Sequence, residues 1–491
     1  MRQNKVGVPN WFKPFGHFNV IGFLLLGGAL YAQSFEEFKQ SQMKAYEDDK
    51  AQREREFRSF LNSEWKAYKE SQGFKVYEKP KPKTLPSVVE KVSIPVGPAV
   101  IIKPLIKKVP IQKKEIEKKE VKIPQLVVKP IQEYDIVLFG KSFLFEKDKS
   151  LGKATFEPQN KQGITNFFDT LTQSNYQKTV DTLALHVKEH QLNDWALYLL
   201  SQKLSYTLYK ADNEAKLFQW FMLNQLGYDI KVALQKSKVV VLSKSKKTIY
   251  STPNYTLSKH HYYAIDYYNQ KGLGAIRTYE GNYPDAVKSL NLELKEIPKF
   301  NAHSDNRELS FRYRGQKHTL HVKYNQNLIN FMQTYPQADY DAYFNAPLDE
   351  ESSRSLVSAL KPIIDGKAAS DAINILLYFV QHAFTYELDQ EQFGREKVMF
   401  AQETLYYKKS DCEDRAVLFS YLVKNLLGYD VVGVKYSDHM ATAVAVPMQG
   451  DALNIASDRY VIADPTYMNA PIGKSMPKYK NVRPEKYIRV D

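Results

Sequence analysis

A long stretch rich in lysine and proline constrains the fold most, because it cannot form a packed core and so separates the chain into parts. It runs from about residue 79 to residue 130 and begins Lys79-Pro80-Lys81-Pro82-Lys83. Proline fixes φ and removes a hydrogen-bond donor, and repeated lysines repel one another. We therefore expect residues 76–133 to form an extended linker and residues 134–491 to be globular.

The composition is typical of a soluble protein with more than one folded domain. A chain of 491 residues is too long for one ordinary core, and it contains 43% hydrophobic and 25% charged residues. Its net charge of +14 favours contact with polyanions. The linker can therefore touch an acidic envelope polymer, with a plain spacer as the simpler interpretation. Scattered Lys and Tyr do not indicate a nucleic-acid module.

The N-terminus has the pattern of an export signal. Arg2, Lys5 and Lys13 precede an apolar run over residues 18–29, and small residues follow near Ala32. The run is short for a full bilayer crossing. We expect residues 1–32 to be a signal peptide or an uncleaved anchor, which places the protein in the periplasm or outside the cell and its N-terminal segment near a membrane.

The rest of the chain predicts an α+β protein. Residues 33–75 are expected to form an amphipathic helix with one apolar stripe, made of Phe57, Phe60, Leu61, Trp65 and Tyr68. This stripe packs on the rest of the protein, mediates self-association or docks on a partner. Residues 134–300 are helical over 163–226 and then β-like. Residues 301–349 form a β-rich connector with a hairpin around Arg314-Gly315, and residues 350–491 mix helices and strands.

The only cysteine, Cys412, marks the segment with the strongest chemical signal. It begins an apolar helix that Gly428 ends, with Ser410 or Asp411 as the cap. A thiolate gains from the unpaired N–H groups and the dipole of a helix N-terminus. The neighbouring carboxylates oppose this effect, so an activated thiol needs a cationic partner.

Two strands supply candidates for a base and an orienting carboxylate. His439 begins a strand that continues to residue 446, and Asp464 follows a strand that begins at Tyr460. Alternating Ala441 and Ala443 predict close packing of the first strand against the cysteine helix. Thiol, imidazole and carboxylate in this order can converge as a nucleophile, a base and its orienting group.

These segments resemble bacterial transglutaminase-like domains over about the last 140 residues. The resemblance rests on Glu403-Thr404-Leu405, on Ser410-Asp411-Cys412-Glu413-Asp414-Arg415-Ala416, on Asp438-His439 and on Ala463-Asp464-Pro465-Thr466. Family members usually carry Gly where Ser410 stands. The resemblance implies a papain-like domain in which Cys412 is the nucleophile, His439 the general base and acid, and Asp464 the orienting residue.

Two further points of this interpretation stay open. The Cys412 N–H would supply one oxyanion donor, and Gln402 and Tyr406 are the candidates for the second. The structural alternatives are a small buried cysteine and an Asp464 that only forms a turn before proline.

An internal repeat predicts a second, degenerate copy of this domain within residues 134–300. At an offset of 201 positions, residues 412–430 lie over residues 211–229, and eight of these nineteen pairs are identical. Ala211 then replaces the cysteine and Lys238 the histidine, and Asp266 loosely matches Asp464. Chance recurrence of an amphipathic helix that ends in Leu-Gly-Tyr-Asp is the alternative.

No cofactor or metal site is expected. His186 and His190 frame an H-x-x-E-H pattern, which arises easily by chance, and no third ligand is apparent from the sequence. The expected function is an exported thiol hydrolase or acyltransferase that acts on amide bonds of a protein or peptide substrate. The alternative is an envelope scaffold without catalysis.

Overall fold

The computed structural model describes residues 30–71, 85–88, 99–100, 132–270 and 272–491, which fall into two compact units, 1–55 and 56–491. Most of the predicted signal over residues 1–32 and most of the predicted linker lie outside the described residues. Within the described residues, no helix is long and apolar enough to cross a membrane.

Helix α1 (Leu30–Asn62) is shorter than the helix expected over residues 33–75. Ser63 bonds to the Phe60 carbonyl, and the chain then runs as strand β1 (Lys66–Tyr68). Phe57 and Leu61 are buried, and the Phe57 ring lies 5.8 Å from that of Trp220. This end of the helix therefore packs on its own protein. Residues 37–49 are exposed.

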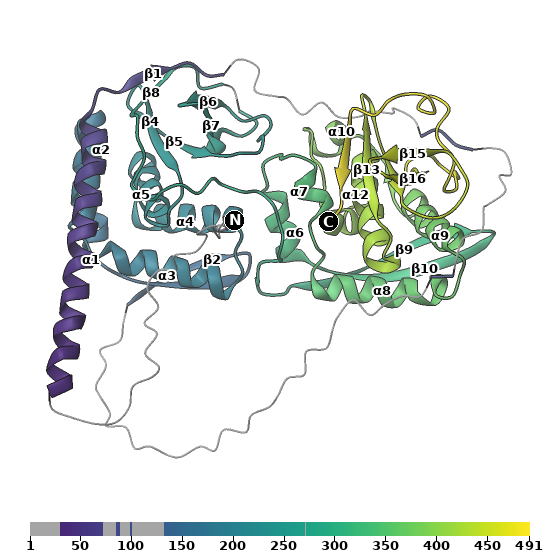
Figure 1. The fold of residues 1–491 in the computed structure, drawn as a ribbon, viewed down its shortest axis with the longest axis horizontal. Helices are drawn as coiled ribbons and strands as arrows, with labels where there is room; N and C mark the ends of the chain where they lie inside the picture. Colours follow the sequence, from purple (N-terminus) through teal and green to yellow (C-terminus); the bar gives the residue numbers. More distant parts are fainter. Residues whose placement is uncertain (1–29, 72–84, 89–98, 101–131, 271) are drawn as a thin grey trace, which may run out of the picture. The chain divides into compact units, whose positions relative to one another are not determined.

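The N-terminal half of the larger unit, residues 132–300, combines a hairpin, four α-helices and a sheet (Figure 1). The hairpin is β2 (Glu133–Leu138) and β3 (Lys141–Glu146). The helices are α2 (Lys161–Thr172), α3 (Tyr176–Glu189), α4 (Asp194–Leu208) and α5 (Asp212–Gln225). The sheet has the order β1-β8-β4-β5-β7-β6, with β4 (Ile230–Gln235), β5 (Lys238–Lys244), β6 (Asn254–Leu257), β7 (His260–Tyr263) and β8 (Ile276–Thr278).

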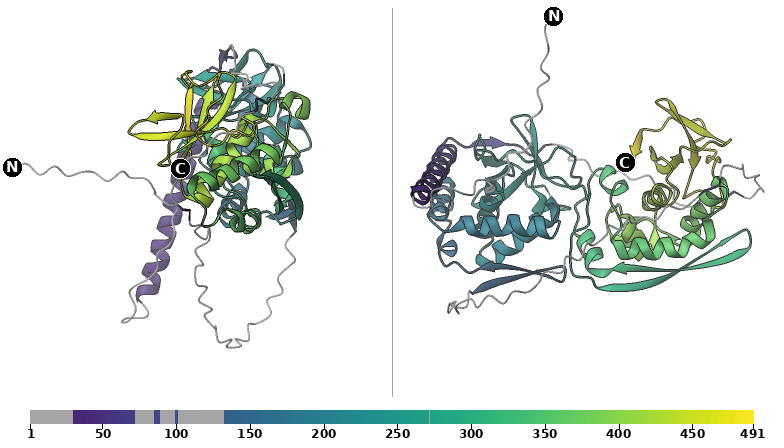
Figure 2. Two further views of the ribbon diagram at one scale, coloured as in Figure 1. Left: turned by 90° about the vertical axis from the view of Figure 1, so that its right-hand side faces the viewer. Right: turned by 60° about the horizontal axis from the view of Figure 1, so that its bottom comes forward.

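The C-terminal half, residues 301–491, begins with a long hairpin rather than a separate connector. Strands β9 (Ser304–Tyr313) and β10 (Gln316–Asn325) turn at Arg314-Gly315, where both residues have positive φ. Figure 2 shows this hairpin beside α8 (Glu350–Ile364), and β9 contacts α9 (Ala369–His382). The predicted hairpin is therefore present and packs on helices of the C-terminal half, while the boundaries of a connector over residues 301–349 stay a prediction.

The remaining elements of this half build a second sheet around one buried helix. The shorter helices are α6 (Gln326–Gln333), α7 (Asp341–Phe344), α10 (Asp389–Phe393) and α11 (Ala401–Tyr406). Helix α12 (Cys412–Leu422) continues as a π-helical turn, η3 (Val423–Leu427). The sheet order is β15-β16-β14-β13-β17, with β13 (Val431–Tyr436), β14 (His439–Val444), β15 (Ala452–Ile455), β16 (Asp458–Ala463) and β17 (Lys486–Arg489). A short parallel pair joins β11 (Thr385–Tyr386) to β12 (Lys409–Ser410).

Apart from the additional edge strand β1, the two sheets share their strand order, and their first hairpins share a register. In each half a helix is followed by two hairpins and a strand that returns beside the first strand of the sheet. Ile230 pairs with Ser243, and Val431 pairs with Val444, which is the same register shifted by 201 positions. The glycine after each helix, Gly227 or Gly428, has positive φ.

Each sheet also has a second apolar cluster on one face. Ala441 and Ala443 belong to that cluster in the C-terminal half, whereas Met440 and Val444 join the larger core that contains Cys412. The expected packing of this strand on the cysteine helix is therefore present, but through the face opposite the one that carries these alanines. Successive residues of a strand face opposite sides, so the larger side chains of β14 face α12.

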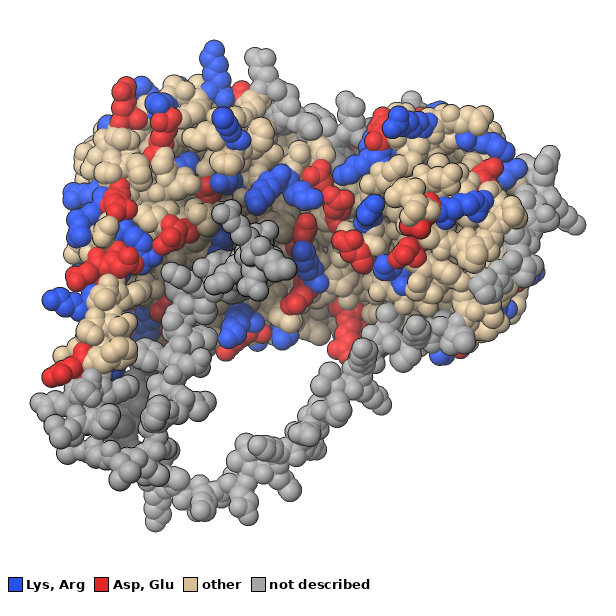
Figure 3. Space-filling view, viewed as in Figure 1, with Lys and Arg blue, Asp and Glu red and all other residues tan. Residues whose placement is uncertain are grey.

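Charged side chains of both signs are interspersed on the face shown in Figure 3. On that face, neither Lys and Arg nor Asp and Glu gather into one patch over the described residues.

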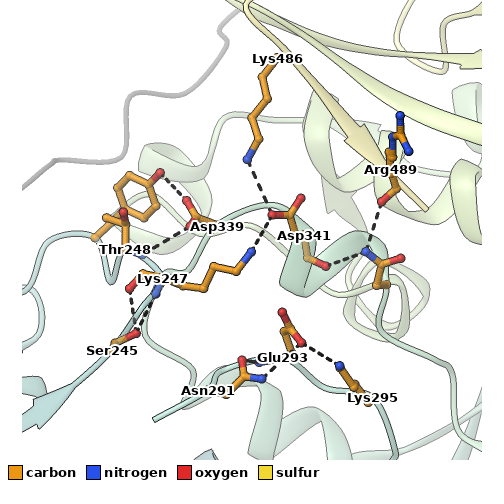
Figure 4. A network of polar contacts seen from close by, with 12 residues as sticks. Ser245, Lys247, Thr248, Asn291, Glu293, Lys295, Asp339, Asp341, Lys486 and Arg489 are labelled. Atoms are coloured by element: carbon orange, nitrogen blue, oxygen red, sulfur yellow. Dashed lines mark hydrogen bonds and ion pairs between the residues drawn. The ribbon is translucent and has the colours of Figure 1, made fainter. Parts of the chain in front are cut away.

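Polar contacts join the two halves near Asp341 (Figure 4). Lys247 lies 3.2 Å and Lys486 3.8 Å from this carboxylate. Tyr250 donates to Asp339 at 2.9 Å, and an isolated bridge pairs Ile249 with Ala338. The Asp341 carboxylate thus interacts with one lysine from each half.

Two short pieces of the expected linker contact the C-terminal half. Val88 donates its N–H to the Met468 carbonyl, and Met468 donates to the Pro86 carbonyl, both at 2.9 Å. Val100, which is buried, donates to the Lys367 carbonyl at 2.9 Å. Residues 85–88 and 99–100 are therefore docked segments, which a plain spacer does not predict.

Candidate active site

Cys412 is the first residue of α12, and Asp411 is its N-cap. The Asp411 N–H donates to Asp414 at 3.2 Å, which fixes the first turn of the helix. The helix packs on β13 and β14 (Figure 1), and the Cys412 side chain is 0% exposed. The thiol thus lies at a helix N-terminus inside the protein.

His439 and Asp464 meet across neighbouring strands. The register of β14 and β16 pairs Thr442 with Ala463, and His439 Nε2 lies 2.7 Å from Asp464 Oδ2. The other carboxylate oxygen accepts the N–H groups of Thr466 at 2.9 Å and Tyr467 at 3.2 Å. Asp464 therefore forms the turn expected before proline and also contacts the imidazole. A carboxylate at Nε2 favours the tautomer in which Nδ1 carries the lone pair.

The thiol lies close to the start of β14. Met440, the residue after His439, gives its N–H to Sγ. Within the described residues, His439 Nδ1 is buried and has no hydrogen-bond partner. The geometry therefore leaves the nitrogen opposite Asp464 available for a proton from a nearby donor.

The thiol is held in its protonated form in this conformation. Burial raises the pKa of Cys412, the charges of Glu413 and Asp411 raise this pKa further, and the Met440 N–H acts in the opposite direction. The Sγ–H group donates to Glu413 Oε2 at 3.2 Å. The contribution of the helix N-terminus is thus outweighed by burial and by the adjacent carboxylates.

Arg415 is the buried cation closest in sequence to the thiol. It is 0% exposed and donates to the Phe384 carbonyl at 2.8 Å and to Ser410 Oγ at 3.1 Å. Burial lowers the pKa of Arg415 to about 10, so this side chain stays charged at neutral pH. Its charge interacts with the carboxylates of Asp411 and Asp414. Arg415 therefore stabilises the acidic start of α12.

Two tyrosines of this site were missed by the sequence reasoning. Burial raises the pKa of Tyr386, with a smaller contribution from the charge of Cys412. The Tyr479 ring stacks on His439 with a centroid distance of 5.0 Å. Both tyrosines lie outside the motif segments, so nothing local in the sequence distinguishes them from the other tyrosines.

The predicted second oxyanion donors are engaged in other contacts. The Gln402 amide donates to Ser352 Oγ at 2.9 Å and to Asp349. The Tyr406 ring packs edge-on against Tyr324 and Tyr407. The assignment of Gln402 or Tyr406 stays a prediction.

Two clusters within the described residues have ligand atoms close enough to hold a metal ion. One consists of Asp389, Asp411 and Glu413, all buried, and the other of His186, Glu189 and His190. In the second, the third group is Glu189, the glutamate of the H-x-x-E-H pattern itself. His186 Nε2 lies 3.1 Å from the Leu144 carbonyl.

The structure thus places an imidazole that a carboxylate contacts directly before Met440, whose N–H bonds to the thiol. No family model, curated protein or solved structure matches this chain.

Proposed function

We propose that the protein is an exported thiol-dependent hydrolase or acyltransferase that acts on amide bonds of a protein or peptide. The observation that carries the proposal is the 2.7 Å contact between His439 Nε2 and Asp464 Oδ2, beside a strand whose Met440 N–H reaches the Cys412 thiol. The buried Asp464 has both oxygens engaged, which is how an orienting carboxylate is held in place.

In the proposed reaction, Cys412 Sγ forms a bond to the substrate carbonyl carbon while His439 Nδ1 takes the thiol proton. The tetrahedral intermediate collapses, the C–N bond breaks, and His439 returns the proton to the leaving amine. Water or a second amine then attacks the thioester, with His439 again accepting a proton, and the thiol is restored. Because the thiol is protonated at rest, the proton transfer accompanies the attack.

The same proposal includes a transglutaminase-like, papain-like fold for the C-terminal half and a degenerate copy in the N-terminal half. The shared strand order, and the register of the first hairpins at the offset of 201 positions, support it. In the N-terminal half, Asp266 accepts hydrogen bonds from Tyr198 at 2.9 Å and Gln202 at 3.0 Å instead of a histidine. The Lys238 ammonium lies 5.0 Å from the Tyr267 ring centroid. We infer that this half positions the other or binds a partner.

The second candidate function is an envelope scaffold. The complete burial of Cys412 and the raised pKa of its thiol favour this alternative, since an inert cysteine has both properties. Export to the periplasm or beyond, and contact of the basic linker with an acidic envelope polymer, remain parts of the proposal that rest on the sequence.

The direct test is to trap the thioester. The protein is incubated with a mixture of synthetic peptides rich in Gln, Asn and amidated ends, and intact mass spectrometry records covalent adducts and cleaved or transamidated products. We expect products with the native protein and none with Cys412→Ala. Cys412→Ala is isosteric enough to keep the fold, so products that persist in this variant would contradict the proposal.

A further inference from the structure

The candidate site is closed in this conformation. Cys412 and His439 are 0% exposed, and Asp464 is 2% exposed. A substrate carbonyl therefore cannot reach Sγ unless some part of the protein moves. The question is which segment covers the site and what holds it.

Residues 464–485, which connect β16 to β17, form the cover. Tyr479 lies in this segment, and its ring stacks on His439 at 18° and on Tyr436 at 27°. The Tyr479 hydroxyl donates to Asp438 at 2.8 Å, and Lys478 forms an ion pair with the same carboxylate. Burial and the contact with Asp438 raise the pKa of Tyr479, with a smaller contribution from the charge of Cys412.

Residues 85–88, which lie far away in the sequence, contact residues 464–485 near the N-terminal end of that segment. Residues 85–88 pair with Met468 as a parallel bridge, through the two backbone hydrogen bonds at 2.9 Å. Asn469 adds a side-chain bond to Ser87 Oγ at 3.0 Å. Val88 packs against the apolar cluster that contains Tyr436, Tyr467 and Tyr479. Residues 85–88 thus contact the backbone shortly after Asp464 and also the apolar cluster that contains Tyr479, the tyrosine stacked on His439.

We propose that residues 85–88 are a latch that keeps the cover of residues 464–485 closed over Cys412 and His439. The proposal rests on the proposed function, since it concerns regulation of that site. Release of the latch lets the cover open, and an extended peptide can then occupy the backbone edge at Met468 that the latch vacates. Such an edge offers one donor and one acceptor to an incoming strand.

The chain offers a matched pair of variants to test this. Val88→Pro removes the N–H that bonds to Met468, and Val100→Pro removes the N–H that bonds to Lys367. Both valines lie in the same expected linker and both bond through one backbone N–H, but only Val88 contacts the cover. Tyr479→Ala removes the ring over His439 directly.

The readout is the rate at which iodoacetamide alkylates Cys412 at pH 9, with circular dichroism to establish folding. Loss of one net hydrogen bond from the closed state should raise the rate about tenfold in Val88→Pro. We expect the alkylation rate to rise at least as much in Tyr479→Ala. In Val100→Pro we expect this rate to change by less than about twofold.

Either of two results in folded samples would overturn the latch: a native rate in Val88→Pro, or an equal acceleration in Val100→Pro. A native rate in Tyr479→Ala would overturn the cover. Each comparison is repeated with His439→Ala. The faster alkylation of Val88→Pro should persist in the His439→Ala background, because it reports access of iodoacetamide to Cys412. If the proposed function fails, only the dependence of the alkylation rate on His439 disappears.

Discussion

Arg415 shows how much of the candidate site depends on single buried groups. Its guanidinium satisfies the carbonyls of Gln381 and Phe384, and it faces the carboxylates of Asp411 and Asp414. The motif reasoning placed Arg415 in a family segment but assigned it no role. Its function became apparent only from contacts with residues that lie far away in the sequence.

Replacement of Arg415 by Met should therefore be costly. The change leaves two carboxylates and two carbonyls without their buried cation, and we expect the free energy of unfolding to fall by about 3 kcal/mol. Urea denaturation measures the loss. The control is Arg354→Met, which removes an exposed pair with Glu350 and should cost less than about 1 kcal/mol. Equal losses would contradict this account of Arg415.

Lys231 predicts a pH dependence of stability in the N-terminal half. Burial lowers the pKa of Lys231 from 10.5 to about 8. Between these two values the unfolded chain binds more protons than the folded one, so stability rises with pH. The cost of the buried charge is fully present below pH 8 and is relieved as pH approaches 10.5.

Lys231→Met should remove this contribution. The difference in unfolding free energy between variant and native protein should change by up to about 3 kcal/mol between pH 7 and pH 10, in the direction that favours the native protein at high pH. Denaturant titrations at several pH values measure it. Lys178→Met, on an exposed lysine, serves as the control, and a parallel shift of both variants would refute the assignment.

At the scale of elements, the strongly patterned segments were predicted well. The strand that begins at His439 and the helix that ends at Gly428 were confirmed, as was the turn at Arg314-Gly315. Each has a local signal, such as a glycine at positive φ or β-branched residues at alternate positions. The short strands β15 and β17 were missed, because four mostly exposed residues carry almost no pattern.

Gly428 gives a test of the element boundary. It ends the helix that follows Cys412 with φ +72°, and a Cβ there would meet nothing within 4 Å. Gly428→Ala should therefore lower the free energy of unfolding by about 1 kcal/mol through backbone strain alone. Gly152, which is equally open but has no positive φ, is the matched control. Thermal or urea unfolding of Gly152→Ala should show no comparable loss.

At the scale of the whole molecule, long-range contacts were what the sequence could not reveal. The linker was recognised from its Lys and Pro content, but its docking at Met468 and Lys367 depends on partners hundreds of residues away. The internal repeat was visible only over residues 211–229, whereas the matching sheets extend well beyond them. The two sheets share their strand order even where their side chains differ, which a comparison of the two sequences does not reveal.

The junction at Asp341 should contribute little stability of its own. Lys247 and Lys486 are both about half exposed, so solvent screens their attraction to the carboxylate. We expect Asp341→Asn to cost less than about 1 kcal/mol, and the difference to shrink at high salt. Urea midpoints at low and high salt measure both values. A large, salt-independent loss would indicate that the junction is structurally essential.

The central claim is that Cys412, His439 and Asp464 act as one unit, and the pH dependence of alkylation of the single thiol tests it most directly. Iodoacetamide rates are measured from pH 5 to pH 10 in the native protein, His439→Ala and Asp464→Asn. The account predicts that native Cys412 reacts at least about tenfold faster than either variant near pH 7, below the ordinary thiol pKa near 8.5. Rates that agree within about twofold in folded samples would contradict it and favour the scaffold.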